Sequence, residues 1–81
     1  MKVKVRFFAL QRKATGKSEL EIKLEEKTTI NGLLEALMAQ YPELKKLAEF
    51  TVVSLNQNHA NRCELLRDGD EVVLFSVVVG G

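Results

Sequence analysis

Residues 29–41, which read TINGLLEALMAQY, carry the strongest structural signal in the chain. Apolar side chains recur here at intervals of three and four residues, which is the spacing of one face of an α-helix. These side chains belong to Ile30, Leu33, Leu34, Leu37 and Tyr41. Thr29 is a suitable N-cap, and Pro42 marks the helix end because the residue before a proline disfavours helical geometry. The stretch therefore predicts one amphipathic helix with a single apolar face to bury.

Strand patterns precede this helix. From Val3 to Leu10 the residues suited to a buried face occur at every second position, and the same alternation returns over residues 19–25. A period of two is typical of strands that have one buried face. Residues 12–17, with Gly16 among them, break the pattern and predict a turn. Two strands joined by a short polar loop are expected to form an antiparallel hairpin.

Strand patterns also follow the helix. The predicted elements there are a short second helix over 43–50, a strand over 51–55, a turn at 56–58, a tight turn around Gly69 and a final strand over 71–77. A hairpin, one main helix and further strands fit an α+β fold in which a mixed sheet carries the helix on one face, an arrangement of the β-grasp type. We expect residues 1–75 to form this domain and residues 76–81 to form a flexible, extended C-terminal tail.

The composition excludes several classes of function. The chain has 81 residues, 46% of them hydrophobic and 28% charged, with a formal net charge of +1. These values indicate one ordinary globular domain without the basic excess that nucleic acid or an anionic membrane attracts. No apolar run approaches the roughly 20 residues of a membrane-spanning helix, and the N-terminus lacks the apolar stretch of a signal peptide. We therefore expect a cytoplasmic protein with neither a nucleic-acid nor a membrane partner.

Few side chains suit catalysis. The chain has one histidine, His59, and one cysteine, Cys63, which lie four residues apart. They are the components of a thiolate–imidazolium pair, but a buried cysteine that packs as a small hydrophobe beside a loop histidine is far more usual. A metal site needs three or four convergent ligands, which this pair does not supply. We expect no cofactor or metal on this chain, and no enzyme activity from the chain alone.

The C-terminus is more informative, because the sequence ends in Gly80-Gly81. Glycine has no Cβ, so its narrow profile suits a tight channel in another protein. The terminal carboxylate of Gly81 can then be presented to a partner's buried site. An acyl-adenylate formed there is reactive enough to accept sulfur and to become a thiocarboxylate.

Apolar residues near this terminus predict a partner surface. Alternation along the last strand places Val72 and Leu74 in the core and Phe75 on the opposite face. Val77 and Val79 continue that second face, and Phe8 and Leu10 of the first strand are expected beside it. The partner-binding residues that we predict are Phe75, Val77, Val79 and Phe8. Exposed apolar patches of this kind usually mark protein–protein contacts.

Four segments occur in a recognisable order along the chain. They are Val5-Arg6-Phe7-Phe8-Ala9, Val53-Ser54-Leu55-Asn56, Leu66-Arg67-Asp68-Gly69-Asp70 and the terminal Gly80-Gly81. Together they resemble the small subunit of molybdopterin synthase, the MoaD family of ubiquitin-like sulfur carriers, over essentially the whole chain. The family commonly has a pair of prolines just before the tail, where this chain has Ser76-Val77 or Val77-Val78.

The resemblance implies a reaction cycle. An E1-like adenylating enzyme of the MoeB type uses ATP to adenylate Gly81, and a sulfur source then converts it to a thiocarboxylate. The terminus next enters the large synthase subunit, of the MoaE type, and sulfur passes to cyclic pyranopterin monophosphate in molybdenum cofactor biosynthesis. Gly80 gives the terminus passage, and the face around Phe75 docks both partners in turn. The synthase is expected to be a heterotetramer of two large and two small subunits.

Three alternatives stay open at this point. One is another carrier with the same fold, either a ThiS-like donor for the thiamine thiazole or an archaeal-type modifier that is conjugated to lysines. A second is a plain β-grasp interaction module in which Gly-Gly is incidental. The third is an enzyme centred on His59 and Cys63. The segment Phe7-Phe8-Ala9 and the long helix favour the molybdopterin branch.

Overall fold

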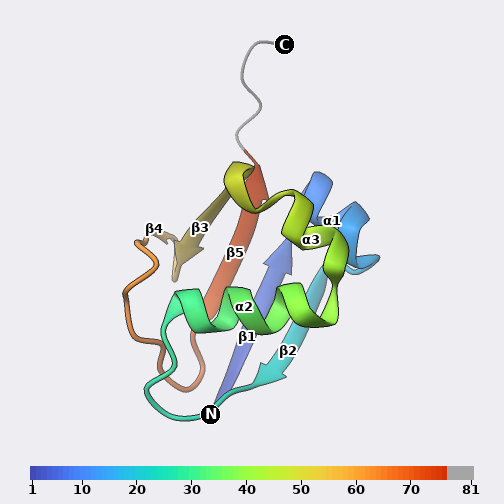
Figure 1. The fold of residues 1–81 in the computed structure, drawn as a ribbon. Coiled ribbons are helices and arrows are strands. Elements are labelled where there is room, and N and C mark those ends of the chain that lie inside the picture. Colours follow the sequence, from blue (N-terminus) through green and yellow to red (C-terminus); the bar gives the residue numbers. More distant parts are fainter. Residues whose placement is uncertain (77–81) are drawn as a thin grey trace.

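The chain folds around one mixed β-sheet. A computed structural model describes residues 1–76. Its elements are β1 (Lys2–Phe7), α1 (Leu10–Thr15), β2 (Glu19–Lys23), α2 (Ile30–Gln40), α3 (Pro42–Lys46), the 3₁₀ helix η1 (Ala48–Phe50), β3 (Thr51–Leu55), β4 (Asn58–His59) and β5 (Glu71–Ser76). The strand order is β2-β1-β5-β3-β4, in which β1 and β5 run parallel and the other neighbours are antiparallel. Helix α2 crosses one face of this sheet (Figure 1), so the predicted α+β arrangement is confirmed.

Helix α2 supplies four of the thirteen buried residues of the hydrophobic core among the described residues. Thr29 caps it as predicted, because the threonine hydroxyl accepts a hydrogen bond of 3.1 Å from the Gly32 amide. The predicted stripe is buried except for Tyr41, which is half-buried. The stripe packs against alternate residues of the central strands, namely Val3, Val5, Phe7, Val53, Val72 and Leu74. Full burial of one such aliphatic or aromatic side chain contributes roughly 1.5–3 kcal/mol, so this layer dominates the stability of the domain.

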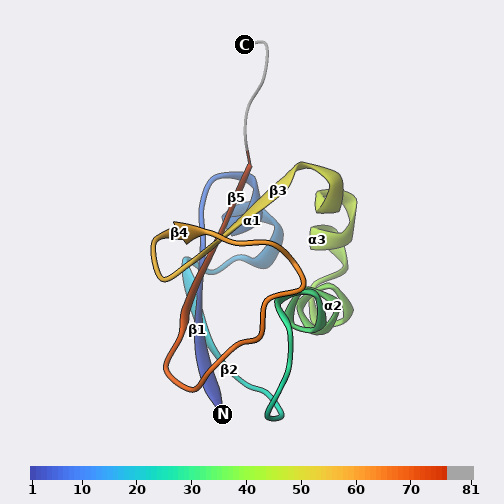
Figure 2. The same ribbon diagram turned by 90° about the vertical axis from the view of Figure 1, so that its left-hand side faces the viewer.

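The other face of the sheet is not covered by a helix within the described residues. Figure 2 shows α2 and α3 together on one side of the strands. Arg6, Val73 and Val52 belong to the uncovered side, because their strand neighbours on the opposite side are buried. This uncovered side is called the open face below.

The predicted turn over residues 12–17 is wrong. Residues Leu10–Thr15 form helix α1, which ends at Gly16 with a φ of 73° and an amide that donates to the Arg12 carbonyl over 2.8 Å. Strand β1 ends at Phe7, and the chain turns at Ala9, whose φ is 50°. The prediction that the strand continues through Ala9 and Leu10 is therefore wrong. The antiparallel pairing of the two strands is nevertheless as expected. Helix α1 has one buried residue, Gln11, and therefore lacks the apolar periodicity that identifies a helix in a sequence.

The segment after α2 is divided where one helix was predicted. Pro42 begins α3, a position where its missing amide hydrogen does no harm. Leu44 is buried, whereas Leu47 and Ala48 are half-buried. Helix α3 ends at Lys46, and η1 then brings the chain to Thr51, where β3 begins as the β-branched pattern predicts.

Two turns interlock at the end of the sheet where β5 begins. Asn56 and Gln57 have φ values of 49° and 73° and connect β3 to β4. The Asn56 side chain accepts from the Glu71 amide at 2.9 Å and donates to an Asp70 carboxylate oxygen at 3.0 Å. The other Asp70 carboxylate oxygen accepts from the Arg67 amide at 2.7 Å. These bonds explain two of the recognised sequence segments as structural features.

The interlock leads to a stability prediction. We expect Asn56→Ala to lower the free energy of unfolding by about 1–2 kcal/mol more than Gln57→Ala, because only Asn56 loses side-chain hydrogen bonds to the neighbouring turn. Both positions have positive φ, so the backbone strain that alanine introduces is similar in the two variants. Urea denaturation followed by circular dichroism measures the difference. Equal losses in the two variants would contradict the interlock.

Candidate functional site

The candidate site is the end of the sheet where β5 finishes. Ser76 is the last residue of β5 and pairs with Thr51, the first residue of β3. From Ser76 the sequence continues through three valines to Gly80 and Gly81. Those two glycines, together with Val77 and Val79, lie outside the described residues, and the roles predicted for them remain predictions. Thr51 directly follows η1, which therefore adjoins the end of β5.

Exposed apolar side chains gather at this end. Among the described residues the exposed large hydrophobics are Phe8, Leu10, Phe50 and Leu65. Phe8 follows β1, and its amide donates to the Leu74 carbonyl of β5 over 3.1 Å. Leu10 begins α1, and Phe50 immediately precedes β3. Only Leu65 belongs to a segment remote from Ser76, since it bridges to the residue before α2.

Phe75 lies on the open face beside Phe8. It is half-buried and lies opposite Val52 of β3, which is also half-buried. The parallel register that places Phe7 beside Leu74 brings Phe8 beside Phe75. The residues Phe8, Leu10, Phe50 and Phe75 are called the exit cluster below. The sequence analysis identified Phe8 and Phe75 as partner-binding residues, and it missed Phe50, because an isolated phenylalanine at the end of a short helix gives no periodic signal.

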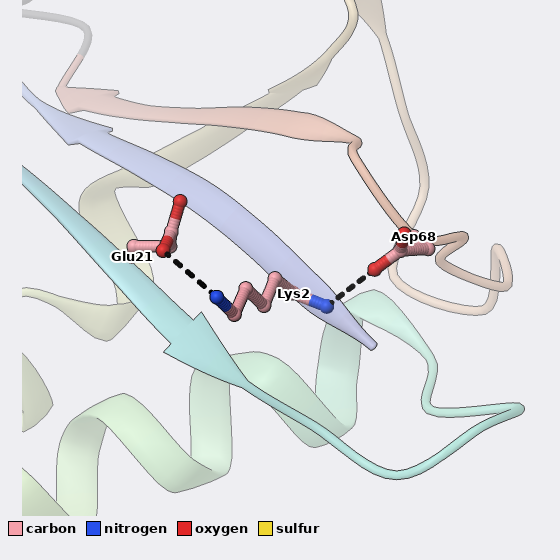
Figure 3. Close-up of polar contacts among 3 residues, drawn as sticks. All are labelled: Lys2, Glu21 and Asp68. Carbon is pink, nitrogen blue, oxygen red and sulfur yellow. Dashed lines mark hydrogen bonds and ion pairs between the residues drawn. The ribbon is translucent and has the colours of Figure 1, made fainter.

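The part of the open face farther from Ser76 is charged, and two lysines of β1 form ion pairs with glutamates of β2 there. The Lys2 ammonium lies 3.9 Å from Glu21, and the Lys4 ammonium lies 3.7 Å from Glu19. Figure 3 shows the first pair together with the Lys2 backbone amide, which donates to the Asp68 carboxylate over 2.7 Å. Such exposed ion pairs each contribute only about 0–1 kcal/mol. Each of the two pairs is neutral, whereas the Arg6 guanidinium carbon lies 5.6 Å from the centroid of the Phe8 ring, so a cation borders the exit cluster.

A buried amide lies behind the exit cluster. Gln11 of α1 is the one fully buried polar side chain among residues 1–76. Its Nε2 donates to Thr51 Oγ1 at 3.1 Å and to Ser76 Oγ at 2.7 Å. The Thr51 hydroxyl itself donates to the Leu47 carbonyl at 2.8 Å, so it must accept from Gln11. The sequence analysis missed Gln11 because it predicted no helix there.

The Gln11 side chain is not fully satisfied. Its Oε1 is buried and has no hydrogen-bond partner among the described residues. An unpaired buried acceptor costs about 1–3 kcal/mol of stability. The network that Gln11 forms with Thr51 and Ser76 is called the polar latch below.

The structure does not bring the predicted His59 and Cys63 together as a buried site. His59 ends β4 and is exposed. Cys63 is exposed, which corrects the expectation of a buried cysteine, and its amide donates to the Asn61 side chain over 2.9 Å. Within residues 1–76 no group of three or more metal-binding side chains is found. No helix in the same part of the chain is long and apolar enough to cross a bilayer.

Comparison with solved structures defines the class of protein. The described fold is that of the ubiquitin-like β-grasp proteins. SAMP1 from Haloferax volcanii superposes with a TM-score of 0.91 at 24% identity, with 100% of each chain covered, and this likeness shows the shared fold. Sequence comparison narrows the class. A model of the ThiS family matches residues 5–81, and the chain belongs to that family.

Relatives within the family carry a more specific name. The molybdopterin synthase sulfur carrier subunit of Chlamydomonas reinhardtii is 32% identical over 83 residues, with all of both chains covered. A complex of subunits 1 and 2 of the molybdopterin-converting factor from Helicobacter pylori contains a chain that matches with a TM-score of 0.72 at 28% identity, again over 100% of both chains. The resemblance to the molybdopterin synthase sulfur carriers found in the sequence is thereby confirmed.

The position of Cys63 allows a direct check of this part of the structure. We expect one equivalent of Ellman's reagent to react with the native protein about as fast as with the urea-unfolded chain, because the thiol is already exposed. The release of thionitrobenzoate, followed by its absorbance at about 412 nm, gives the rate of the thiol reaction in each state. A thiol that reacts only after urea is added would place Cys63 in the interior, as the sequence analysis expected.

Proposed function

We propose that this chain is the sulfur carrier subunit of a molybdopterin synthase and that the carboxylate of Gly81 carries the sulfur. The observation that carries the proposal is the likeness to the Chlamydomonas subunit over the whole of both chains. The fold supports it, because the sequence passes from the central strand β5 to Gly80 and Gly81 within five residues of Ser76. Gly80 serves passage through a narrow channel, since a residue without Cβ occupies the least width.

The proposed chemistry uses a backbone group. A Gly81 carboxylate oxygen attacks the α-phosphorus of ATP, and pyrophosphate leaves. A persulfide sulfur then attacks the acyl carbon and displaces AMP, and reduction of the resulting acyl disulfide by a thiol frees the thiocarboxylate. Sulfur next passes to cyclic pyranopterin monophosphate, and the carboxylate is restored by water. This chain would supply a rigid body and a docking surface, whereas ATP and the catalytic side chains would belong to its partners.

The exit cluster is the proposed docking surface for both partners. These are an E1-like adenylating enzyme of the MoeB type and a large synthase subunit of the MoaE type, with two large and two small subunits in the synthase. The Helicobacter complex supports a partner subunit for a chain of this fold. Val77 and Val79 would extend the contact along the terminus. We place the protein in the cytoplasm, because one cysteine gives no internal disulfide to maintain.

The carrier proposal is tested by intact-mass measurement. We expect the protein to gain about 16 Da, the difference between a sulfur and an oxygen atom, after incubation with ATP, a MoeB-type enzyme and a persulfide donor with its thiol reductant. Deletion of Gly81 should abolish the gain, since the reacting carboxylate is then displaced. The thermal midpoint of the deletion variant should match that of the full chain, because the core lies within residues 3–74. No gain with an enzyme that is active on another carrier would refute the proposal.

The docking surface is tested with two leucines. Leu10 and Leu65 are 44% and 57% exposed, and only Leu10 belongs to the exit cluster. We expect Leu10→Ala to weaken binding to the large synthase subunit on the order of tenfold, the usual effect of truncating a central contact residue. Leu65→Ala should leave the dissociation constant unchanged. Isothermal titration calorimetry measures both, and equal effects would argue against the exit cluster as the contact.

The molecule that accepts the sulfur distinguishes a molybdopterin synthase carrier from other carriers with the same fold. A thiocarboxylated chain that converts cyclic pyranopterin monophosphate in the presence of the large subunit is a molybdopterin synthase carrier. A chain that instead supports thiazole formation, or that becomes attached to lysines, is a carrier of the other type. Fold alone does not distinguish these outcomes, because one scaffold hosts several functions.

A further inference from the structure

We propose that Gln11 is a positioning residue for the carrier terminus, acting through its hydrogen bond to Ser76. The inference rests on the proposed function, because it assigns to the polar latch the task of fixing the point from which the Gly81 carboxylate is presented. Gln11 touches none of the reacting atoms. It sets where the chain leaves the domain.

The first argument is the position of Ser76 in the sheet. Strand β1 pairs with β5 only as far as Leu74 in the strand register, and its following residue, Phe8, bonds to the same leucine. Ser76 is therefore paired on one side alone, with Thr51 at the very start of β3. Residues at such strand ends fray readily unless other bonds hold them. The 2.7 Å bond from Gln11 Nε2 to Ser76 Oγ provides that hold.

The second argument is the way the latch is anchored. Gln11 belongs to α1, Thr51 to β3 and Ser76 to β5, so one amide group joins three elements. Thr51 is further tied to the Leu47 carbonyl at the end of α3. Both hydrogens of Nε2 are used, one for each hydroxyl, which fixes the orientation of the amide plane. A side chain held at two points and fully buried has little freedom to let Ser76 move.

The third argument is that the latch is a poor device for stability. An apolar side chain of similar size would fill the same space without leaving an acceptor unpaired, and Gln11 Oε1 is left without a partner among residues 1–76. Two hydrogen bonds from one buried amide fix the positions of polar groups, which packing alone does not do. The amide holds Ser76 in place through a hydrogen bond, which an apolar side chain would not form.

Positioning matters in this chemistry because the reacting group lies at the end of the chain. An adenylating enzyme must hold the carboxylate in line with the α-phosphorus of ATP, and misplacement by about 1 Å can cost on the order of a hundredfold in rate. The exit cluster docks the body of the carrier, whereas the latch sets the origin of the segment that enters the enzyme. Loss of the latch should thus affect turnover rather than docking.

The decisive variant is Gln11→Leu in the full chain. We expect kcat for thiocarboxylate formation with the MoeB-type enzyme to fall on the order of tenfold, with KM for the carrier unchanged. The urea midpoint should change little, because the loss of two hydrogen bonds is offset by removal of a polar amide from the core. A merely structural role predicts the reverse pattern, a lower midpoint with unchanged kcat, and that pattern would overturn the inference.

Further variants test whether Gln11 acts through its hydrogen bond to Ser76. Ser76→Ala should lower kcat as much as Gln11→Leu, and the double variant should be no worse than either, because both remove the same bond. Ser76→Thr retains the hydroxyl and should preserve kcat. Ser54→Ala removes a hydroxyl of β3 that is not part of the latch, from a residue paired with Val73, and serves as the matched control with kcat close to that of the wild type. Should Gln11→Leu fail to fold, the contrast between Ser76→Ala and Ser76→Thr tests the same bond, and additive losses would reject it.

A partner-free measurement separates this inference from the proposed function. The ¹⁵N order parameter of the Ser76 amide should decrease in Gln11→Leu relative to the wild type, whatever enzyme the carrier serves. A wild-type chain that gains no sulfur refutes the proposed function and with it the carrier role of Gln11. A wild-type chain that gains sulfur, with an equal kcat in Gln11→Leu, refutes the positioning role alone.

Discussion

The parallel pairing of β1 with β5 is the constraint on which the rest of the structure depends. It places the first and last described strands side by side at the centre of the sheet, where both are buried against α2. Because the two strands run in the same direction, the residues that follow β1 emerge at the same end as Ser76. Phe8, α1 and Gln11 are therefore neighbours of the departing chain as a consequence of topology.

The two ends of the sheet have different tasks. At the end where β5 begins, Asn56 and Asp70 join two turns through a dense set of hydrogen bonds, which fixes the register of the strands. At the end where β5 finishes, apolar side chains are exposed and a buried amide remains partly unsatisfied. This division is typical of proteins in which a stable scaffold supports a surface that retains an energetic cost for function.

Sequence patterns predicted the parts of the fold that rest on many residues. The α2 stripe has four buried members and a threonine cap, and β3 is marked by β-branched residues, so both were placed well. Features that rest on one or two residues were missed. Helix α1 buries only Gln11, a polar residue, and hydrophobic periodicity has nothing to detect there. The exposure of Cys63 and Phe50 depends on tertiary packing around short segments, which no local pattern encodes.

The same pairing of β1 with β5 has a consequence for biosynthesis. Strand β1 leaves the ribosome well before its central partner β5, which begins only at Glu71. Loop closure over such a distance is slow, and the core between α2 and the sheet cannot form before β5 is available. Nascent chains interrupted before residue 71 would thus remain unfolded and open to proteolysis. Synthesis itself would then favour molecules that possess the strand from which the terminus is presented.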